Sequence, residues 1–149
     1  MTHQDYMRQA LALAQEAAAA GEVPVGCVIV DKDGQVIGRG RNRREEEKNP
    51  LAHAELDAIA DACRRYGDWR LKGARLYVTL EPCPMCAGGI ISARIPEIYY
   101  GAKDAGFGAC GSILNLFEED FRHHPKIVGH ILEAECAALL RDFFAQVRE

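Results

Sequence analysis

The first apolar pattern in the chain has the period of a helix. Between residues 5 and 20, apolar side chains recur at spacings of three and four, starting with Tyr6 and Met7. This spacing predicts an amphipathic helix with one face towards a core, and Gly21 predicts its end. Further helices are predicted over residues 52–65, 84–92 and 133–147.

Short apolar runs predict strands between these helices. The first two runs, 26–30 and 35–40, flank Asp33-Gly34, a dipeptide that favours a tight hairpin turn. Further strands are predicted over residues 74–80, 98–102 and 126–131. Because strands alternate with helices after an opening hairpin, we expect an α/β fold, a three-layer α/β/α sandwich with a mixed central sheet.

Two segments lack either period and are predicted to be loops. Residues 41–51 are polar, and residues 104–111 are rich in glycine. Tyr99 and Tyr100, on a predicted strand, are expected to pack inside the fold. The apolar side chains of the last helix are also expected to face the core, namely Leu139, Leu140, Phe143 and Phe144.

Length and composition indicate one globular domain over residues 1–149. Domains commonly have ~100–200 residues, and hydrophobic residues make up 48% of this chain and charged residues 27%. No stretch approaches the ~18 apolar residues of a membrane span, and the N-terminus lacks the pattern of a signal peptide. We therefore expect a cytoplasmic protein with no membrane partner.

Cysteine content and net charge indicate which ligands the protein can bind. Six cysteines without a secretory signal indicate thiols or metal ligands rather than disulfides. The net charge of −4 does not indicate that the whole surface binds nucleic acid, so an RNA contact would need a local basic patch. Arginines within residues 39–44 either form such a patch or are screened by the glutamates at 45–47.

Two short clusters carry the candidate chemistry, and each begins a predicted helix. His53 and Glu55 lie at the start of one helix, and Cys83 and Cys86 at the start of the next. Loops that lead from strands into helices form the ligand sites of open α/β sheets, so we expect both clusters to face one pocket. The positive end of a helix also lowers the pKa of a thiol, which favours a metal-binding thiolate.

One imidazole and two thiolates form a ligand set that suits zinc. With three protein ligands, the fourth position is open to water, whose pKa zinc lowers to ~7. Glu55 lies two positions from His53 and does not share its helix face. We therefore expect Glu55 to carry protons rather than to bind the metal.

A structural zinc site is the main alternative, and it needs four protein ligands. Cys27, Cys63 and Cys136 lie in apolar segments and are expected to pack in the core, which leaves Cys110 as the candidate fourth ligand. Against this alternative, the order His-x-Glu, then Pro-Cys-x-x-Cys after a strand, is the signature of zinc deaminases.

At these residues the sequence resembles the cytidine deaminase superfamily, and most closely the bacterial tRNA-specific adenosine deaminases. The resemblance covers nearly the whole chain, including residues 22–26, 40–43, 52–55, 76–83 and 135–144. It implies a cytidine deaminase-like fold that binds one zinc ion per subunit through His53, Cys83 and Cys86, with Glu55 as the proton carrier. It also implies a homodimer that converts adenosine to inosine at the wobble position of a tRNA anticodon stem-loop.

The resemblance further implies which residues contact the substrate. Asn42 would hydrogen-bond the target base, and Val25, Gly26 and Ala54 would shape its pocket. The remaining contacts with RNA are expected from Asp104, Arg122, His123 and Phe144.

The chain departs from the family pattern in the glycine-rich loop and again just before the predicted strand 126–131. Gly106 stands where family members usually have lysine, and Arg122-His123 where an Asn-His pair is common. Phe107 either stacks on a base or anchors its own loop, and we favour the anchor. These departures favour an alternative function, deamination of a free nucleobase or nucleoside. A non-catalytic, zinc-stabilised interaction domain is a third hypothesis.

Overall fold

The computed structural model describes residues 1–147. Residues 148 and 149 of the predicted domain lie outside this part. The helices are α1 (His3–Ala19), α2 (Arg44–Glu47), α3 (Ala54–Tyr66), α4 (Pro84–Ser92) and α5 (Glu133–Val147). The strands are β1 (Gly26–Val30), β2 (Val36–Arg41), β3 (Arg75–Leu80), β4 (Glu97–Ala102) and β5 (Lys126–Val128), and a 3₁₀ turn, η1 (Leu116–Glu118), precedes β5.

The strands form a single sheet in the order β2-β1-β3-β4-β5. β1 runs antiparallel to β2 and β3, whereas β3, β4 and β5 run parallel to one another. The predicted hairpin joins β1 to β2, and Gly34 in its turn has a φ of 87°, which glycine adopts without strain. The predicted mixed sheet is confirmed.

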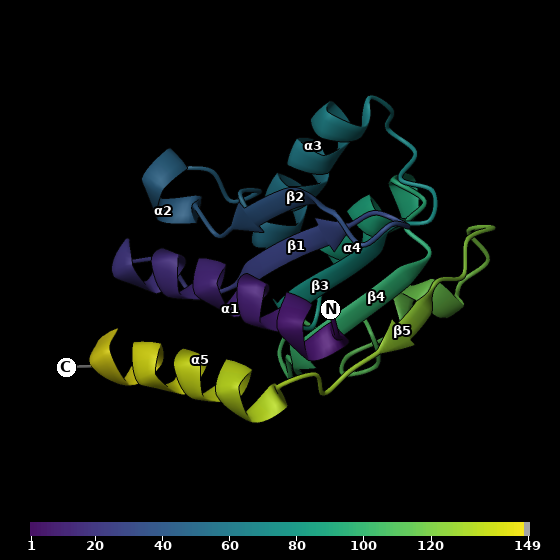
Figure 1. The fold of residues 1–149 in the computed structure, drawn as a ribbon. Helices are drawn as coiled ribbons and strands as arrows, with labels where there is room; N and C mark the ends of the chain where they lie inside the picture. The colour runs from purple at the N-terminus through teal and green to yellow at the C-terminus, as the bar shows by residue number, and fades with distance from the viewer. Residues whose placement is uncertain (148–149) are drawn as a thin grey trace.

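Helices cover both faces of this sheet (Figure 1). α1 and α5 pack on one face, and α3 and α4 pack on the other. β1 is buried along its whole length because its side chains alternate between the two cores, with Val28 on the α1 side and Ile29 on the α3 side. The predicted three-layer sandwich is therefore also confirmed.

α3 lies very close to β2, an edge strand of the sheet. A Cβ atom added to Gly40 would lie 2.3 Å from the carbonyl oxygen of Ala54, and one added to Gly38 would lie 2.5 Å from that of Ala58. A side chain at either glycine would push the helix away from the strand. This contact fixes the N-terminus of α3, next to His53.

The polar segment 41–51 is not a loop throughout, as the sequence predicts, because it contains α2. The backbone N–H groups of Glu45 and Glu46 donate to the carboxylate of Glu22, at 3.1 and 2.8 Å. Glu22 is buried and comes from a distant part of the chain. It satisfies free N–H groups at the start of α2, which the local sequence cannot reveal.

The last helix is less buried than predicted. Cys136 is its one buried side chain among the described residues, Leu139, Leu140 and Phe143 are half-buried, and Phe144 is 42% exposed. Figure 1 shows the reason, since the C-terminal part of α5 extends beyond the ends of the strands. A helical period identifies an apolar face but does not say whether the sheet is long enough to cover it.

Two smaller predictions are confirmed. Tyr99 and Tyr100 are buried on β4, and α4 begins and ends at the residues that the sequence predicts. Within residues 1–147, no helix combines the length and the apolar character that a membrane crossing requires.

Candidate active site

His53 directly precedes α3 as its N-cap residue, with an extended backbone (φ −89°, ψ 153°). The N–H group of the next residue, Ala54, donates to Oδ1 of Asn42 at 3.0 Å. Asn42 is buried, and its Nδ2 donates to the carbonyl oxygen of Val23 at 3.1 Å. A side chain that follows β2 thus holds the start of α3 in place.

Cys83 occupies the same position on the next helix. It is the N-cap of α4, and Pro84 fills the first helical position, where its missing N–H group costs no hydrogen bond. Cys86 is buried in the first turn of the helix. Both sulfur atoms therefore lie at the positive end of a helix dipole, which favours a thiolate. At Cys86 a hydrogen bond to Cys83 and burial act in the opposite direction and raise the pKa of the thiol.

The side chains at these two helix starts converge. Nδ1 of His53 lies 3.7 Å from Sγ of Cys83 and 3.5 Å from Sγ of Cys86, and all three atoms lie within 4.8 Å of one another. Tetrahedral zinc, with bonds of about 2.0 Å to nitrogen and 2.3 Å to sulfur, separates such ligands by about 3.5 Å. The three side chains therefore fit a zinc ion.

The charge of the site also suits a cation. Hydrogen bonds donated by the Cys86 thiol and by the His53 imidazole to the Cys83 sulfur lower the pKa of Cys83 to about 4. A thiolate is the form of cysteine that ligates zinc.

Cys110 does not join this group. Among residues 1–147, His53, Cys83 and Cys86 are the only His, Cys, Asp or Glu side chains close enough together to hold one ion. The N–H group of Cys110 instead donates to the carboxylate of Glu81 at 2.9 Å. Three protein ligands leave a coordination position free, which is typical of catalytic rather than structural zinc sites.

Glu55 is buried beside the metal ligands and is not one of them. Burial raises the pKa of its carboxyl group to about 7, with a further contribution from the charge of Cys83. A carboxyl group of this kind can take up and release a proton near neutral pH.

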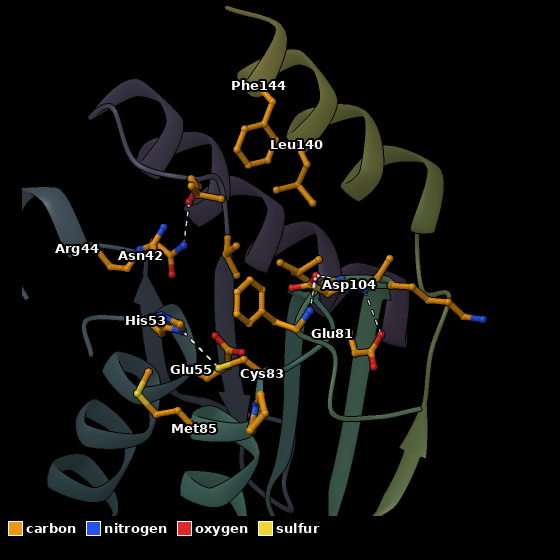
Figure 2. A pocket seen from close by; sticks show the side chains of 18 residues that line it. Asn42, Arg44, His53, Glu55, Glu81, Cys83, Met85, Asp104, Leu140 and Phe144 are labelled. Carbon is orange, nitrogen blue, oxygen red and sulfur yellow. Dashed lines mark hydrogen bonds between the residues drawn. The ribbon is translucent and has the colours of Figure 1, made fainter. Parts of the chain in front are cut away.

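His53, Glu55 and Cys83 line one pocket of about 730 Å³, and Cys86 is buried next to His53 and Cys83 without lining it. Figure 2 shows His53, Glu55 and Cys83 on one side of it, and Leu140 and Phe144 of α5 on another. The volume lies within the usual range of small-ligand sites, ~300–1,000 Å³. The pocket therefore has room for a nucleoside next to the metal ligands.

A buried carboxylate holds a further wall of the pocket. Glu81 accepts hydrogen bonds from the N–H groups of Asp104, Cys110 and Ser112 and from the Ser112 hydroxyl group. Gly108 packs so closely against it that an added Cβ atom would lie 2.4 Å from the carboxylate. We call residues 104–112, held in this way, the latch loop.

The pKa of Glu81 reflects these contacts. Burial alone would raise it, but the hydrogen bonds from Ser112 and from three backbone N–H groups outweigh burial and lower the pKa below its usual value. Sequence reasoning missed this role of Glu81. The available signals were a glutamate next to the Pro-Cys motif and a glycine-rich loop that needs partners for its N–H groups.

Most of the predicted site residues meet at the pocket. Besides His53, Cys83 and Glu55, its lining includes four residues predicted to contact the substrate: Val25, Asn42, Asp104 and Phe144. The pocket also includes residues that sequence reasoning assigned elsewhere or did not single out, among them Val23, Leu80, Met85 and Leu140.

Four predicted contact residues are not among the pocket-lining side chains. Ala54 is buried behind Asn42, and Gly26 faces α1, where an added Cβ atom would lie 2.0 Å from the carbonyl oxygen of Ala10. Nε2 of His123 lies 2.7 Å from the carbonyl oxygen of Ile95, and Arg122 precedes it in the same exposed segment. Their roles towards the substrate stay predictions.

The arginine cluster divides into paired and unpaired members. Arg41 and Arg43 form ion pairs with Glu46 at 2.9 and 3.0 Å, and Arg43 also pairs with Asp57 at 3.3 Å. Arg44 forms no ion pair within residues 1–147, and it lines the pocket together with Lys103. These two cations are therefore available to a phosphate.

Comparison with known proteins agrees with this geometry. The family model for the cytidine and deoxycytidylate deaminase zinc-binding region matches residues 1–102, which include all three zinc ligands. The chain therefore belongs to the cytidine and deoxycytidylate deaminase family, whose members are zinc-dependent hydrolases.

Within this family the chain groups with the tRNA-specific adenosine deaminases. That of Bacillus subtilis (strain 168) is 45% identical over 97% of this chain and 89% of its own length. A structure from a study of A-to-I editing by tRNA:A34 deaminases at the wobble position of transfer RNA is 45% identical, with a TM-score of 0.87 over 91% of this chain and 99% of that one. Guanine deaminase from Bacillus subtilis is 40% identical, with a TM-score of 0.66 over 72% of each chain.

Proposed function

We propose that this protein deaminates adenosine to inosine by hydrolysis at the wobble position of a tRNA anticodon loop. The observation that carries the proposal is a single pocket that joins the zinc ligands, a buried carboxyl group at Glu55 and the amide of Asn42. The relatives that match over nearly their whole length support adenosine in tRNA as the substrate.

His53, Cys83 and Cys86 would hold the zinc ion at the inner end of the pocket. When bound, zinc supplies a Lewis acid that lowers the pKa of water to ~7 and so provides a nucleophile at neutral pH.

Glu55 moves the protons of the reaction. Its carboxylate takes a proton from the attacking water and delivers it to N1 of adenine, while the oxygen bonds to C6. Glu55 then carries the second proton of the water to the amino group, the C6–N bond breaks, and ammonia leaves. The sum is adenosine plus water giving inosine plus ammonia. A pKa near neutrality suits both directions of proton transfer.

Asn42 orients the base. Its amide makes one hydrogen bond through Oδ1 and one through Nδ2 within the fold. A carboxamide has two donor hydrogens and two acceptor lone pairs, so one of each is left for the edge of a purine. Val25, Leu80 and Met85 supply apolar surface for its faces.

The pocket suits a base from a single-stranded loop. Such a base can leave its stack without opening a duplex, so the energetic cost of flipping it is small. Arg44 and Lys103 line the same pocket and can contact neighbouring phosphates. Of the residues outside the pocket, Arg122 and His123 would contact the RNA further from the target.

The protein would act as a homodimer in the cytoplasm. Exposed apolar side chains in the segment that follows the latch loop support a second protein surface there, since Ile113 is 60% and Phe121 is 52% exposed. Light scattering of the purified protein measures the oligomeric state directly.

The decisive test uses the zinc-loaded protein and an anticodon stem-loop with a wobble adenosine. We expect inosine at that position and no reaction when guanosine replaces the adenosine. Free guanine, adenine and their nucleosides are assayed in parallel, because the likeness to guanine deaminase favours a free base as the alternative substrate. Turnover of guanine with no inosine in the RNA would replace this proposal with the alternative.

A further inference from the structure

Phe107 is the most exposed large apolar side chain of the candidate active site. It belongs to the latch loop, lines the pocket and is 70% exposed. The expectation that Phe107 anchors its own loop is therefore wrong, because an anchor would be buried. An exposed aromatic ring beside a ligand pocket calls for another explanation.

The backbone on both sides of Phe107 is held firmly. Oδ1 of Asp104 accepts hydrogen bonds from the N–H groups of Gly106 and Phe107, at 3.0 and 3.1 Å. The next residue, Gly108, donates to the carbonyl oxygen of Asp104 at 2.9 Å and packs against Glu81. The ring is thus presented from a fixed position. Because the loop is already ordered, binding of a ligand costs little conformational entropy of the chain.

The Phe107 ring has no aromatic or cationic partner within residues 1–147. The aromatic pairs and the cation–π contacts of this part of the chain all involve other rings. Phe143 and Phe144, for example, pack edge to face with each other. An exposed aromatic ring in the same pocket as the cations Arg44 and Lys103 matches a ligand with a flat base and a phosphate.

We propose that Phe107 is a stacking platform for an unpaired base next to the target adenosine in the RNA loop. This inference rests on the proposed function and adds to it a residue that binds the neighbouring nucleotide. Unpaired bases in RNA loops commonly stack on aromatic side chains, and this stacking tolerates any base because each has a π face. Phe107 would therefore strengthen binding of the loop without choosing its sequence.

The test compares Phe107→Ala, Phe107→Leu and Phe107→Trp with the wild type on the anticodon stem-loop. Removing an aromatic side chain on which one base stacks typically weakens binding by roughly 5-fold to 150-fold. We expect such a rise in KM for the Ala and Leu variants with kcat nearly unchanged, and recovery in the Trp variant. Full recovery by Leu would show that apolar contact suffices, and would overturn the stacking role.

A fluorescent base gives a second readout that does not depend on activity. 2-Aminopurine is placed on either side of the wobble position, and stacking quenches its fluorescence. We expect quenching by the wild type and by Phe107→Trp, and much less by Phe107→Ala. Equal quenching by all variants at both positions would overturn the inference.

Tyr66→Ala provides a matched control. Tyr66 is another exposed aromatic residue, at the far end of α3 from His53, roughly 20 Å away along a helix that rises 1.5 Å per residue. We expect its KM and quenching to equal those of the wild type. An equal loss in the control would overturn the inference by showing that the effect is not local to Phe107.

Two further outcomes separate the possible failures. If Phe107→Ala changes the oligomeric state in light scattering, the ring covers a second copy of the chain and the inference is overturned. If the wild type forms no inosine in the stem-loop, the proposed function fails first. Inosine formation with unchanged Phe107→Ala kinetics rejects the stacking role alone.

Discussion

The two sides of the pocket are built in different ways. The inner wall consists of side chains at two helix starts, His53, Glu55 and Cys83, backed by Cys86, and all four are buried or half-buried. The outer wall consists of the latch loop and the end of α5, where Phe107 and Phe144 are 70% and 42% exposed. The groups that we assign to the reaction are therefore buried side chains whose positions the fold fixes. The contacts that we assign to nucleotides around the target use exposed side chains, which can change without disturbing the buried ones. Asn42 and Val25, which we assign to the target base itself, are buried.

Removing a metal ligand would have the largest effect on the inner wall. We expect Cys86→Ser to lose zinc and to reduce turnover to background, because a hydroxyl group is a much poorer zinc ligand than a thiolate. Metal analysis of the purified protein and the inosine assay measure the two effects. Cys110→Ser is the matched control and should keep full zinc occupancy. Zinc loss in the control would revive a structural site with four protein ligands.

Replacing Glu55 would separate chemistry from metal binding. We expect Glu55→Gln to keep zinc and fold but to lower kcat by about 10²–10⁴-fold, the usual contribution of a general acid–base group. Single-turnover kinetics at saturating RNA measure the change. Unaltered kinetics would instead fit the hypothesis of a non-catalytic zinc domain.

Replacing Glu81 would loosen the outer wall through its backbone. Glu81→Gln replaces one acceptor oxygen with an NH₂ group, which cannot accept hydrogen bonds from the N–H groups of the latch loop. We expect the free energy of unfolding to fall by about 1–3 kcal/mol, and KM for the stem-loop to rise more than kcat falls. Urea unfolding and steady-state kinetics provide the measurements, and an increase in neither KM nor denaturant sensitivity would contradict this role.

The stability difference between the wild type and Glu81→Gln should also depend on pH. The pKa of Glu81 is lower in the folded protein than its usual value of 4.5. Its contribution to stability is therefore fully present above pH 4.5 and is lost as the pH falls through the lower folded value. Melting temperatures of the two proteins should converge on acidification below pH 4.5. A constant difference would argue that the Glu81 carboxylate does not hold the latch loop in its charged form.

Adding charge to the outer wall would have the smallest effect. Gly106 is exposed, and an added Cβ atom would meet only Oδ1 of Asp104, at 3.6 Å. We expect Gly106→Lys to fold normally, to bind the stem-loop a few-fold more tightly at low salt, and to steepen the salt dependence by about one unit of slope. Binding measured across a salt series tests this, with Gly106→Gln as the uncharged control.

The sequence predicts the inner wall well because its determinants are local. Proline at the first helical position and cysteines three apart define the start of α4, and the predicted limits of that helix are confirmed. The pairing of His53 with Cys83 and Cys86 follows from zinc chemistry together with the rule that helix starts gather at one end of a sheet. Neither inference needs a long-range contact to be known in advance.

The outer wall and α2 are less predictable because distant residues determine them. Glu22 stabilises α2 from 23 residues away, and Glu81 holds the amide of Ser112 from 31 residues away. No local pattern shows that either carboxylate is buried. The exposure of Phe144 depends on where the sheet ends, and that of Phe107 on a loop whose path Asp104 and Glu81 set together.

The glycines of β2 limit which positions can vary when the substrate specificity of such a protein is changed. Gly38 and Gly40 allow the backbone of α3 to touch the strand, so even one methyl group there would displace the helix that carries Glu55. Attempts to redirect the enzyme to other nucleotides by random mutagenesis should therefore tolerate diversity at Gly106 and Phe107 but none at these two sites, although both lie on an edge strand of the sheet.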